Sequence, residues 1–127
     1  MDDGPISHGL RPRAVGRHTC ELPSGGRRLL VSSIAGVRAD GTIEKGLRAQ
    51  LERMFQNLIE TTELAGYSRE QIARIAVVVT EPGRFALYQE VKARMLPGLA
   101  CLDSYRQVAG LSSPSLLCEV DAEIVAS

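Results

Sequence analysis

The chain has 127 residues, of which 44% are hydrophobic and 24% are charged, as expected for one folded globular domain. Fifteen basic side chains balance fifteen acidic ones, and only 4% of the residues are aromatic. Binding to nucleic acids or anionic membrane surfaces depends on excess positive charge and, for single strands, on stacking aromatics, so both partner classes are disfavoured. No apolar run approaches the roughly 20 residues that span a bilayer.

The three cysteines, Cys20, Cys101 and Cys118, are an odd number and include no CxxC pair. This pattern disfavours a disulfide framework or a zinc knuckle and predicts reduced thiols in a cytoplasmic protein. The acidic N-terminus lacks the apolar segment of a secretory signal, which agrees with that location. No metal-ligand spacing, Gly-rich nucleotide loop or serine-hydrolase motif occurs, so no cofactor is expected.

Five glycines and prolines interrupt residues 1–17, which show no apolar periodicity. We therefore predict a flexible N-terminal arm over 1–17 and a single folded domain over 18–127. At the start of this domain, segments 18–22 and 28–36 flank Gly25-Gly26, and this arrangement predicts a β-hairpin.

The segments that follow alternate between helix and strand patterns. Apolar residues recur with the helical period of about 3.6 residues over 42–65 and again over 84–96, which predicts two helices with apolar faces. Between them, 72–80 is an almost continuous apolar run, typical of a strand buried on both faces. Residues 99–109 have an extended pattern, and 116–126 alternate between apolar and acidic residues, which predicts a strand with one buried face.

The predicted order is therefore β-β-α-β-α-β-β, an α+β fold in which two helices cover one face of a single-layer sheet. The other face of the sheet has no predicted cover. Because the strands carry many apolar residues, we expect that face to be buried against other copies of the chain.

Several segments between 28 and 126 carry motifs in a characteristic order. They are 30–33 (Leu-Val-Ser-Ser), Gln50 and Asn57 in the first helix, the strand 72–80, Phe85 with 88–91 (Tyr-Gln-Glu-Val), 108–111 (Val-Ala-Gly-Leu) and 118–122 (Cys-Glu-Val-Asp-Ala). In this order they resemble the Rid family, also called YjgF or L-PSP. Its motifs include a strand ending in Val-Ser-Gly, a Val-x-x-Leu stretch and a Val-Glu-Ile-Glu-Ala signature.

The resemblance implies a chorismate-mutase-like fold and a homotrimer. In such trimers three sheets pack into a central barrel, and ligand clefts lie between neighbouring subunits. The best-known activity of the family is the hydrolysis of reactive enamines and imines to keto acids and ammonia. A pocket Arg holds the substrate carboxylate, and a Glu positions or activates water.

Asp103 marks a departure from the family pattern. Alignment on 108–111 places Asp103 where the family has its pocket Arg. A carboxylate cannot form the paired hydrogen bonds that Arg makes with a substrate carboxylate, and it would repel that group. The standard 2-imino acid substrate is therefore disfavoured. Arg106 is a candidate substrate-binding residue, but strand alternation directs it to the opposite face from Asp103 unless a bulge shifts the register.

Glu119 aligns with the water-handling Glu of the family, and the alternative is a solvated carboxylate on an outer strand face. If Asp103 and Glu119 share a cleft, their like charges raise one pKa and allow the pair to divide acid and base roles. Ser32 and Ser33 are candidate substrate-binding residues or simply satisfy backbone groups at a strand end. Tyr105 should share the face of Asp103, either as a substrate-binding residue or as a packing aromatic.

These residues predict a specialised enzyme of one catabolic or biosynthetic pathway, whose substrate is a reactive imine, enamine or related small molecule. Carboxylate acid–base chemistry would serve hydrolysis, dehydration, tautomerisation or cyclisation. The alternative is a non-catalytic trimer that binds a small metabolite or a protein partner. Ribonuclease activity, which is sometimes attached to the family, is disfavoured by the neutral charge and because both histidines lie in the N-terminal region.

Overall fold

The computed structural model describes residues 13–14, 20–21 and 25–126. The elements in chain order are β1 (Arg13–Ala14), β2 (Cys20–Glu21), β3 (Arg27–Ala35), α1 (Leu47–Leu64), the short 3₁₀ helix η1 (Arg69–Gln71), β4 (Ile72–Val79), α2 (Phe85–Met95), β5 (Leu102–Gln107) and β6 (Cys118–Ala126). The predicted arm lies outside the described residues except for β1, so the division of the chain at residue 17 stays a prediction.

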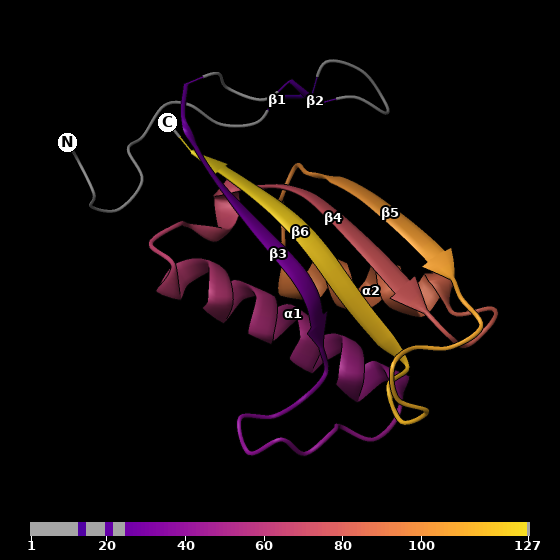
Figure 1. Cartoon of the computed structure of the whole chain (residues 1–127). Helices are drawn as coiled ribbons and strands as arrows, with labels where there is room; N and C mark the ends of the chain where they lie inside the picture. Colours follow the sequence, from indigo (N-terminus) through magenta and orange to yellow (C-terminus); the bar gives the residue numbers. More distant parts are fainter. Residues whose placement is uncertain (1–12, 15–19, 22–24, 127) are drawn as a thin grey trace.

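Four strands form the main sheet in the order β3-β6-β4-β5. β6 lies antiparallel to both β3 and β4, whereas β5 runs parallel to β4 along one edge. Figure 1 shows α1 and α2 packed against the same face of this sheet. The opposite face carries no helix among the described elements. The predicted α+β class, with two helices on a single-layer sheet, is confirmed.

The core lies between the helices and the covered face of the sheet. The apolar stripe of α1 supplies Leu51, Met54, Phe55 and Leu58, each fully buried. Alternate residues of the strands meet this stripe, because successive side chains of a strand point to opposite faces. The buried strand residues that form the core include Val31, Ile72, Ile75, Val77, Val79, Cys118, Val120, Ala122 and Ile124.

Two amides on α1 attach the helix to the loops around it. Gln50 is 1% exposed; its Nε2 donates to the carbonyl oxygens of Glu44 and Ser115, at 3.0 and 2.9 Å. Its Oε1 accepts a hydrogen bond from the Leu117 amide at 2.8 Å. Asn57 donates to the carbonyl oxygens at 35 and 37. Both residues belong to the set of motifs that carries the family resemblance, and in this fold their side chains fix the backbone of neighbouring loops and strands through hydrogen bonds.

Two sequence-based expectations about the elements were wrong. The described part of the predicted hairpin's first segment, Cys20–Glu21, does not pair with the next strand, because β2 pairs with β1 and β3 pairs with β6. The first helix begins at Leu47 and not at Thr42. The five residues before it form a loop in which the Thr42 amide donates to Asp40 at 2.9 Å, and Gly46 has a φ of 86°, outside helical values.

In the part of the chain that the structure describes, no helix is long and apolar enough to cross a membrane.

Candidate functional site

The last strand, β6, separates apolar from acidic side chains. Cys118, Val120 and Ala122 are buried on the helix-covered side, while Glu119, Asp121 and Glu123 alternate with them. Because side chains alternate along a strand, the three carboxylates lie on the outer face of the sheet. This alternation is as predicted from the sequence.

A β-bulge lies opposite these carboxylates on β3. The register between β3 and β6 shifts between Val31 and Ile34, where the two residues Ser32 and Ser33 lie opposite the single residue Asp121. Ser33 has a φ of 60°, a value that L-residues other than Gly, Asn and Asp seldom adopt. Its amide donates a hydrogen bond of 2.7 Å to Oδ1 of Asp121. The bulge therefore fixes both the backbone at Ser33 and one carboxylate oxygen of Asp121.

The three outer carboxylates of β6 differ in their partners. Asp121 accepts a hydrogen bond from the Ser33 amide, and Glu123 forms an ion pair with Arg28. Glu119 forms no hydrogen bond or ion pair with any residue in the described part of the chain. Glu119 is thus the carboxylate of this strand that is available to a ligand or a water molecule.

Asp103 lies on the other side of the sheet. It pairs with Ile75 of β4, a core residue, so its side chain is on the helix-covered face. There its Oδ2 accepts a hydrogen bond from the Tyr88 hydroxyl at 2.9 Å and lies 3.1 Å from Nζ of Lys92. Burial, and then the nearby Asp103 charge, raise the pKa of Tyr88 well above its usual range. Tyr88 therefore stays protonated and donates to Asp103.

Tyr105 shares the face of Asp103 and belongs to an aromatic cluster. Its ring centroid lies 5.1 Å from that of Phe85 in an edge-on arrangement and 4.9 Å from that of Tyr88. Phe85 is 49% exposed, so the cluster reaches the surface next to the edge strand β5. Burial raises the pKa of Tyr105, which keeps the phenol protonated near neutral pH.

Arg106 lies on the same face as Glu119. Both residues pair with Val78 of β4, one from each side. Adjacent strands are about 4.8 Å apart, so the two backbones are separated by roughly 10 Å across the sheet. No ion pair involves Arg106 among the described residues. Arg106 and Glu119, a cation and a carboxylate without an ion-pair partner in the described part of the chain, therefore lie on one face.

Within one chain, the predicted acid–base pair is not brought together. Asp103 is on the helix-covered face with Tyr105, and Glu119 is on the outer face with Arg106 and the serine bulge. A shared cleft for Asp103 and Glu119 would therefore need a second copy of the chain.

The sequence analysis did not identify Lys92 or Tyr88 as part of this site. The signal was available in part, because the two residues are four apart on α2 and so lie on one side of the helix. A carboxylate that contacts Tyr88 therefore also meets Lys92. What could not be predicted was that α2 packs over β5 at the level of Asp103.

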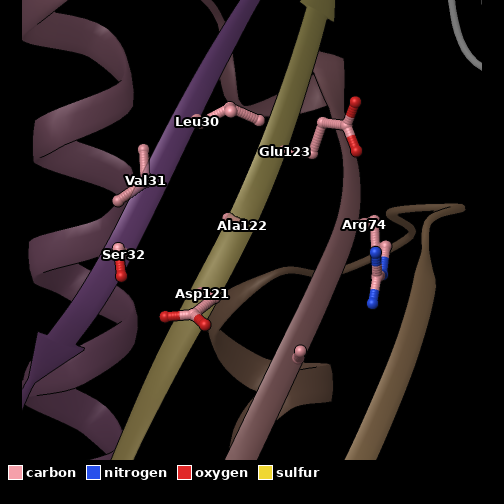
Figure 2. A pocket seen from close by; sticks show the side chains of 8 residues that line it. Leu30, Val31, Ser32, Arg74, Asp121, Ala122 and Glu123 are labelled. Atoms are coloured by element: carbon pink, nitrogen blue, oxygen red, sulfur yellow. The ribbon is translucent and has the colours of Figure 1, made fainter.

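A hollow of about 230 Å³ lies on the outer face over β3, β6 and β4, and Figure 2 shows it from close by. It is lined by Leu30, Val31, Ser32, Arg74, Ala76, Asp121, Ala122 and Glu123. Arg74 was also not predicted as a site residue. Its position within the apolar run 72–80 pointed to a strand face and gave no indication of a partner.

Among the described residues, no group of three His, Cys, Asp or Glu side chains is placed to hold a metal ion. Burial raises the pKa of the Cys118 thiol to about 12, so this cysteine is an unreactive core residue.

Comparisons with known proteins agree with the fold. No family model matches the sequence. A RutC family protein of Aquifex aeolicus is 26% identical over 99 residues, which cover 77% of this chain and 78% of that protein. A Rid-family protein of unknown function from Yersinia pestis superimposes with a TM-score of 0.75 at 26% identity, covering 84% of each chain.

RidA from an Antarctic Psychrobacter superimposes with a TM-score of 0.74 at 25% identity, covering 94% of this chain and 96% of that one. Escherichia coli TdcF, solved with bound serine, has the same fold, with a TM-score of 0.74 at 23% identity over 98% of this chain and all of that one. The motif order, the helix-covered sheet and these relatives agree, and together they support membership of the Rid family, also called YjgF or L-PSP.

Proposed function

We propose that this protein is a specialised Rid-family enzyme that hydrolyses a reactive imine or enamine lacking a carboxylate, in a cleft between the subunits of a homotrimer. The observation that carries the proposal is the state of Glu119. Of the outer carboxylates on β6, it is the one without a hydrogen bond or ion pair among the described residues. The sequence resemblance aligns it with the family's water-handling Glu.

The proposed role of Glu119 is that of a general base. Its carboxylate accepts a proton from water as the water oxygen attacks the carbon of the C=N bond. The nitrogen is protonated, and the resulting carbinolamine collapses to a carbonyl compound and ammonia. One water is consumed for each imine, and neither an oxidant nor a cofactor is required.

The proposed substrate class follows from the charge at residue 103. The family uses an Arg there to hold a carboxylate, whereas this chain has Asp103 paired with Lys92 at 3.1 Å. The pair has no net charge, and the carboxylate would repel a second one. Imines derived from simple amines, or other neutral or cationic intermediates, therefore suit the site better than 2-imino acids.

The proposed cleft lies between subunits because the candidate residues are on opposite faces. Asp103 and Tyr105 are on the edge strand β5, and Glu119, Arg106, Ser32 and Ser33 are on the outer face. If the edge of one subunit meets the outer face of the next, both sets border one space. The exposed Leu30, at 73%, also favours a neighbour over this face.

In this proposal the remaining candidates bind and orient the substrate. Tyr105 and the half-exposed Phe85 form an apolar wall. The hydroxyls of Ser32 and Ser33, which lie 3.4 Å apart at the bulge, donate hydrogen bonds to the substrate. Arg106 stabilises negative charge that develops near Glu119. Asp103 positions Tyr88 and Lys92, and it contributes acid–base chemistry only through the neighbouring subunit's cleft.

The test measures ammonia release from imines made in situ. A flavin amine oxidase supplies imines without a carboxylate, and an amino-acid oxidase supplies 2-imino acids. We expect acceleration of the first class, with a loss of about 100-fold or more in Glu119→Gln, because a general base contributes at least that much. Glu60→Gln, an equal change on the exposed side of α1, should retain full activity. Equal rates in Glu119→Gln, or a preference for 2-imino acids, would contradict the proposal.

A non-catalytic trimer that binds a small metabolite or a protein partner is the second candidate. The observation that favours it is the occupied state of Asp103, whose Oδ2 is held by both Tyr88 and Lys92. In that case no imine of either class would be turned over, and Glu119→Gln would alter ligand affinity alone.

A further inference from the structure

We infer that Gln50, assisted by Asn57, is a positioning residue for Glu119, an inference that rests on the role proposed for Glu119 above. Glu119 is the second residue of β6 and pairs with Ala35, the last residue of β3, and with Val78, the last but one of β4. Three strand ends therefore meet at the proposed general base. Figure 1 shows them at one end of the sheet, near the start of α1.

The backbone of Glu119 needs support because it lies so close to these ends. Strand ends open more readily than strand centres, since they have fewer neighbouring hydrogen bonds. The connection that leads into β6, which the structure describes over 108–117, contains no helix or strand. One backbone contact, from the Thr80 amide to the Leu117 carbonyl at 3.0 Å, joins its last residue to the end of β4. The position of Glu119 therefore depends on what else fixes this connection.

Gln50 fixes the connection from the first turn of α1. Its Oε1 accepts a hydrogen bond from the Leu117 amide at 2.8 Å, and its Nε2 donates to the Ser115 carbonyl at 2.9 Å. Gln50 is 1% exposed, so water cannot readily replace these bonds. Leu117 is two residues before Glu119. Gln50 therefore acts on the backbone that carries the base and does not touch the carboxylate itself.

The same helix also fixes the end of β3. The backbone of Gln50 packs against Gly36, where an added Cβ atom would lie 2.6 Å from the Gln50 Cα atom. Asn57, two turns further along α1, donates to the carbonyl oxygen of Ala35 at 3.0 Å. Because Ala35 is the β3 partner of Glu119, the two amides of α1 hold the start of β6 and the end of β3 together at this pair.

The consequence for catalysis can be estimated from distance. A general base acts only within hydrogen-bond reach of its water molecule, about 2.6–3.2 Å between heavy atoms. A misplacement of about 1 Å can lower a rate by about 100-fold. Loss of the Gln50 hydrogen bonds should therefore reduce the rate, although Gln50 touches neither substrate nor water. Because the effect passes through Glu119, it should disappear when Glu119 is replaced.

The experiment is a double-mutant cycle between Gln50→Met and Glu119→Gln, measured as ammonia release from imines without a carboxylate. Gln50→Met keeps an unbranched side chain of similar length and removes the hydrogen bonds. With Glu119 present, we expect it to lower kcat by about tenfold or more and to leave KM within about twofold. In the Glu119→Gln background, measured at a higher protein concentration, the same change should lower kcat by less than about twofold.

Thr62→Val is the matched control on the same helix. Thr62 is also buried and polar, and its Oγ1 donates to the Leu58 carbonyl at 2.8 Å. It lies about 18 Å further along α1 than Gln50. Thr62→Val should lower the melting temperature and leave kcat within about twofold, because it removes a buried hydrogen bond at a distance from Glu119.

Every variant is assayed at least about 15 °C below its melting temperature, so that unfolding does not lower the rate. If Gln50→Met does not fold, Asn57→Ala takes its place, because Asn57 is only half-buried and its loss should lower kcat by about three- to tenfold. The inference is overturned if the folded variant keeps its kcat, if KM rises instead, or if the loss is equal with and without Glu119. These results would leave the proposed function standing as long as Glu119→Gln is impaired. A wild-type protein that hydrolyses no imine would overturn both proposals.

Discussion

Reversal of the Lys92–Asp103 pair tests whether this contact exists in solution and whether it sets the charge preference of the site. Nζ of Lys92 lies 3.1 Å from Oδ2 of Asp103. Asp103→Arg brings two cations together at this position, and Lys92→Glu brings two carboxylates together. The double variant restores opposite charges, and it places a guanidinium at the position that the sequence resemblance aligns with the family's Arg.

The size of the effect follows from distance and exposure. Two unit charges about 4 Å apart interact by about 4 kcal/mol at an effective dielectric constant of about 20. The side chain of Asp103 is 34% exposed and that of Lys92 is 22% exposed, so solvent screening and lost side-chain entropy reduce this energy. We expect the pair to contribute about 1 kcal/mol and each single reversal to lower the free energy of unfolding by about 2 kcal/mol. The double variant should recover at least half of the summed loss.

Urea unfolding of the four proteins gives the coupling energy, and ammonia release from 2-imino acids gives the charge preference. A guanidinium that binds a substrate carboxylate contributes about 1.5–3 kcal/mol, so Asp103→Arg alone, in which no carboxylate at residue 92 occupies the guanidinium, should hydrolyse 2-imino acids roughly 10- to 150-fold faster than the wild type. Additive losses of stability would show that the pair does not form. The absence of any gain for 2-imino acids in a folded Asp103→Arg variant would show that residue 103 does not face the substrate.

Three further changes test other parts of the structure. Ser33→Gly should raise the free energy of unfolding by about 0.5–1 kcal/mol, because glycine adopts the φ of 60° without strain. Ser33→Ala should not raise it. Urea unfolding compares the two variants, and an equal effect of both would show that the backbone at residue 33 is not strained. Gln50→Leu should lower the free energy of unfolding by about 2–4 kcal/mol in the same assay, because the three hydrogen bonds of a buried amide are lost. The control Gln56→Leu, at an exposed position of the same helix, should lower it by less than about 0.5 kcal/mol. Similar losses in the two variants would contradict the role of Gln50. The pKa of Cys118 rises from an ordinary 9.0 to about 12 in the fold, so above pH 9 the unfolded chain loses this proton first, and stability should fall as the pH rises from 9 toward 12. Cys118→Val should show a shallower fall over that range, and parallel curves would disprove the assignment.

Much of the fold could be predicted because local patterns and tertiary packing agree. The alternation over 116–126 appears in the structure as β6, with its apolar side buried and its acidic side outward. Misplaced boundaries occurred where local contacts overrode propensity. The helix pattern from Thr42 was interrupted by the Asp40 turn and by Gly46 at a positive φ. The hairpin at Gly25-Gly26 failed because β6, about 90 residues later in the chain, competes for the same strand.

The candidate site was harder to predict, because the face on which a residue lies depends on which strands pair. Alternation alone separates Asp103 from Arg106, and it separates Glu119 from Cys118. It cannot decide whether Glu119 shares a face with Asp103 or with Arg106. That choice depends on the register of β5 and β6 against β4, in which Arg106 and Glu119 both meet Val78.

The position of Asp103 under α2 explains how an acidic residue is accommodated there without a change of fold. Tyr88 and Lys92 come from α2, which packs on the sheet through buried residues such as Tyr88 and Val91. Lys92 can therefore neutralise Asp103 without any movement of the backbone, and Glu119 on the other face is unaffected by the exchange. The proposed function, in which Glu119 handles water while residue 103 sets the charge preference, is thus chemically consistent. That proposal requires the two groups to meet across a subunit boundary, so it predicts that a protein held as a monomer retains its fold and lacks imine hydrolysis.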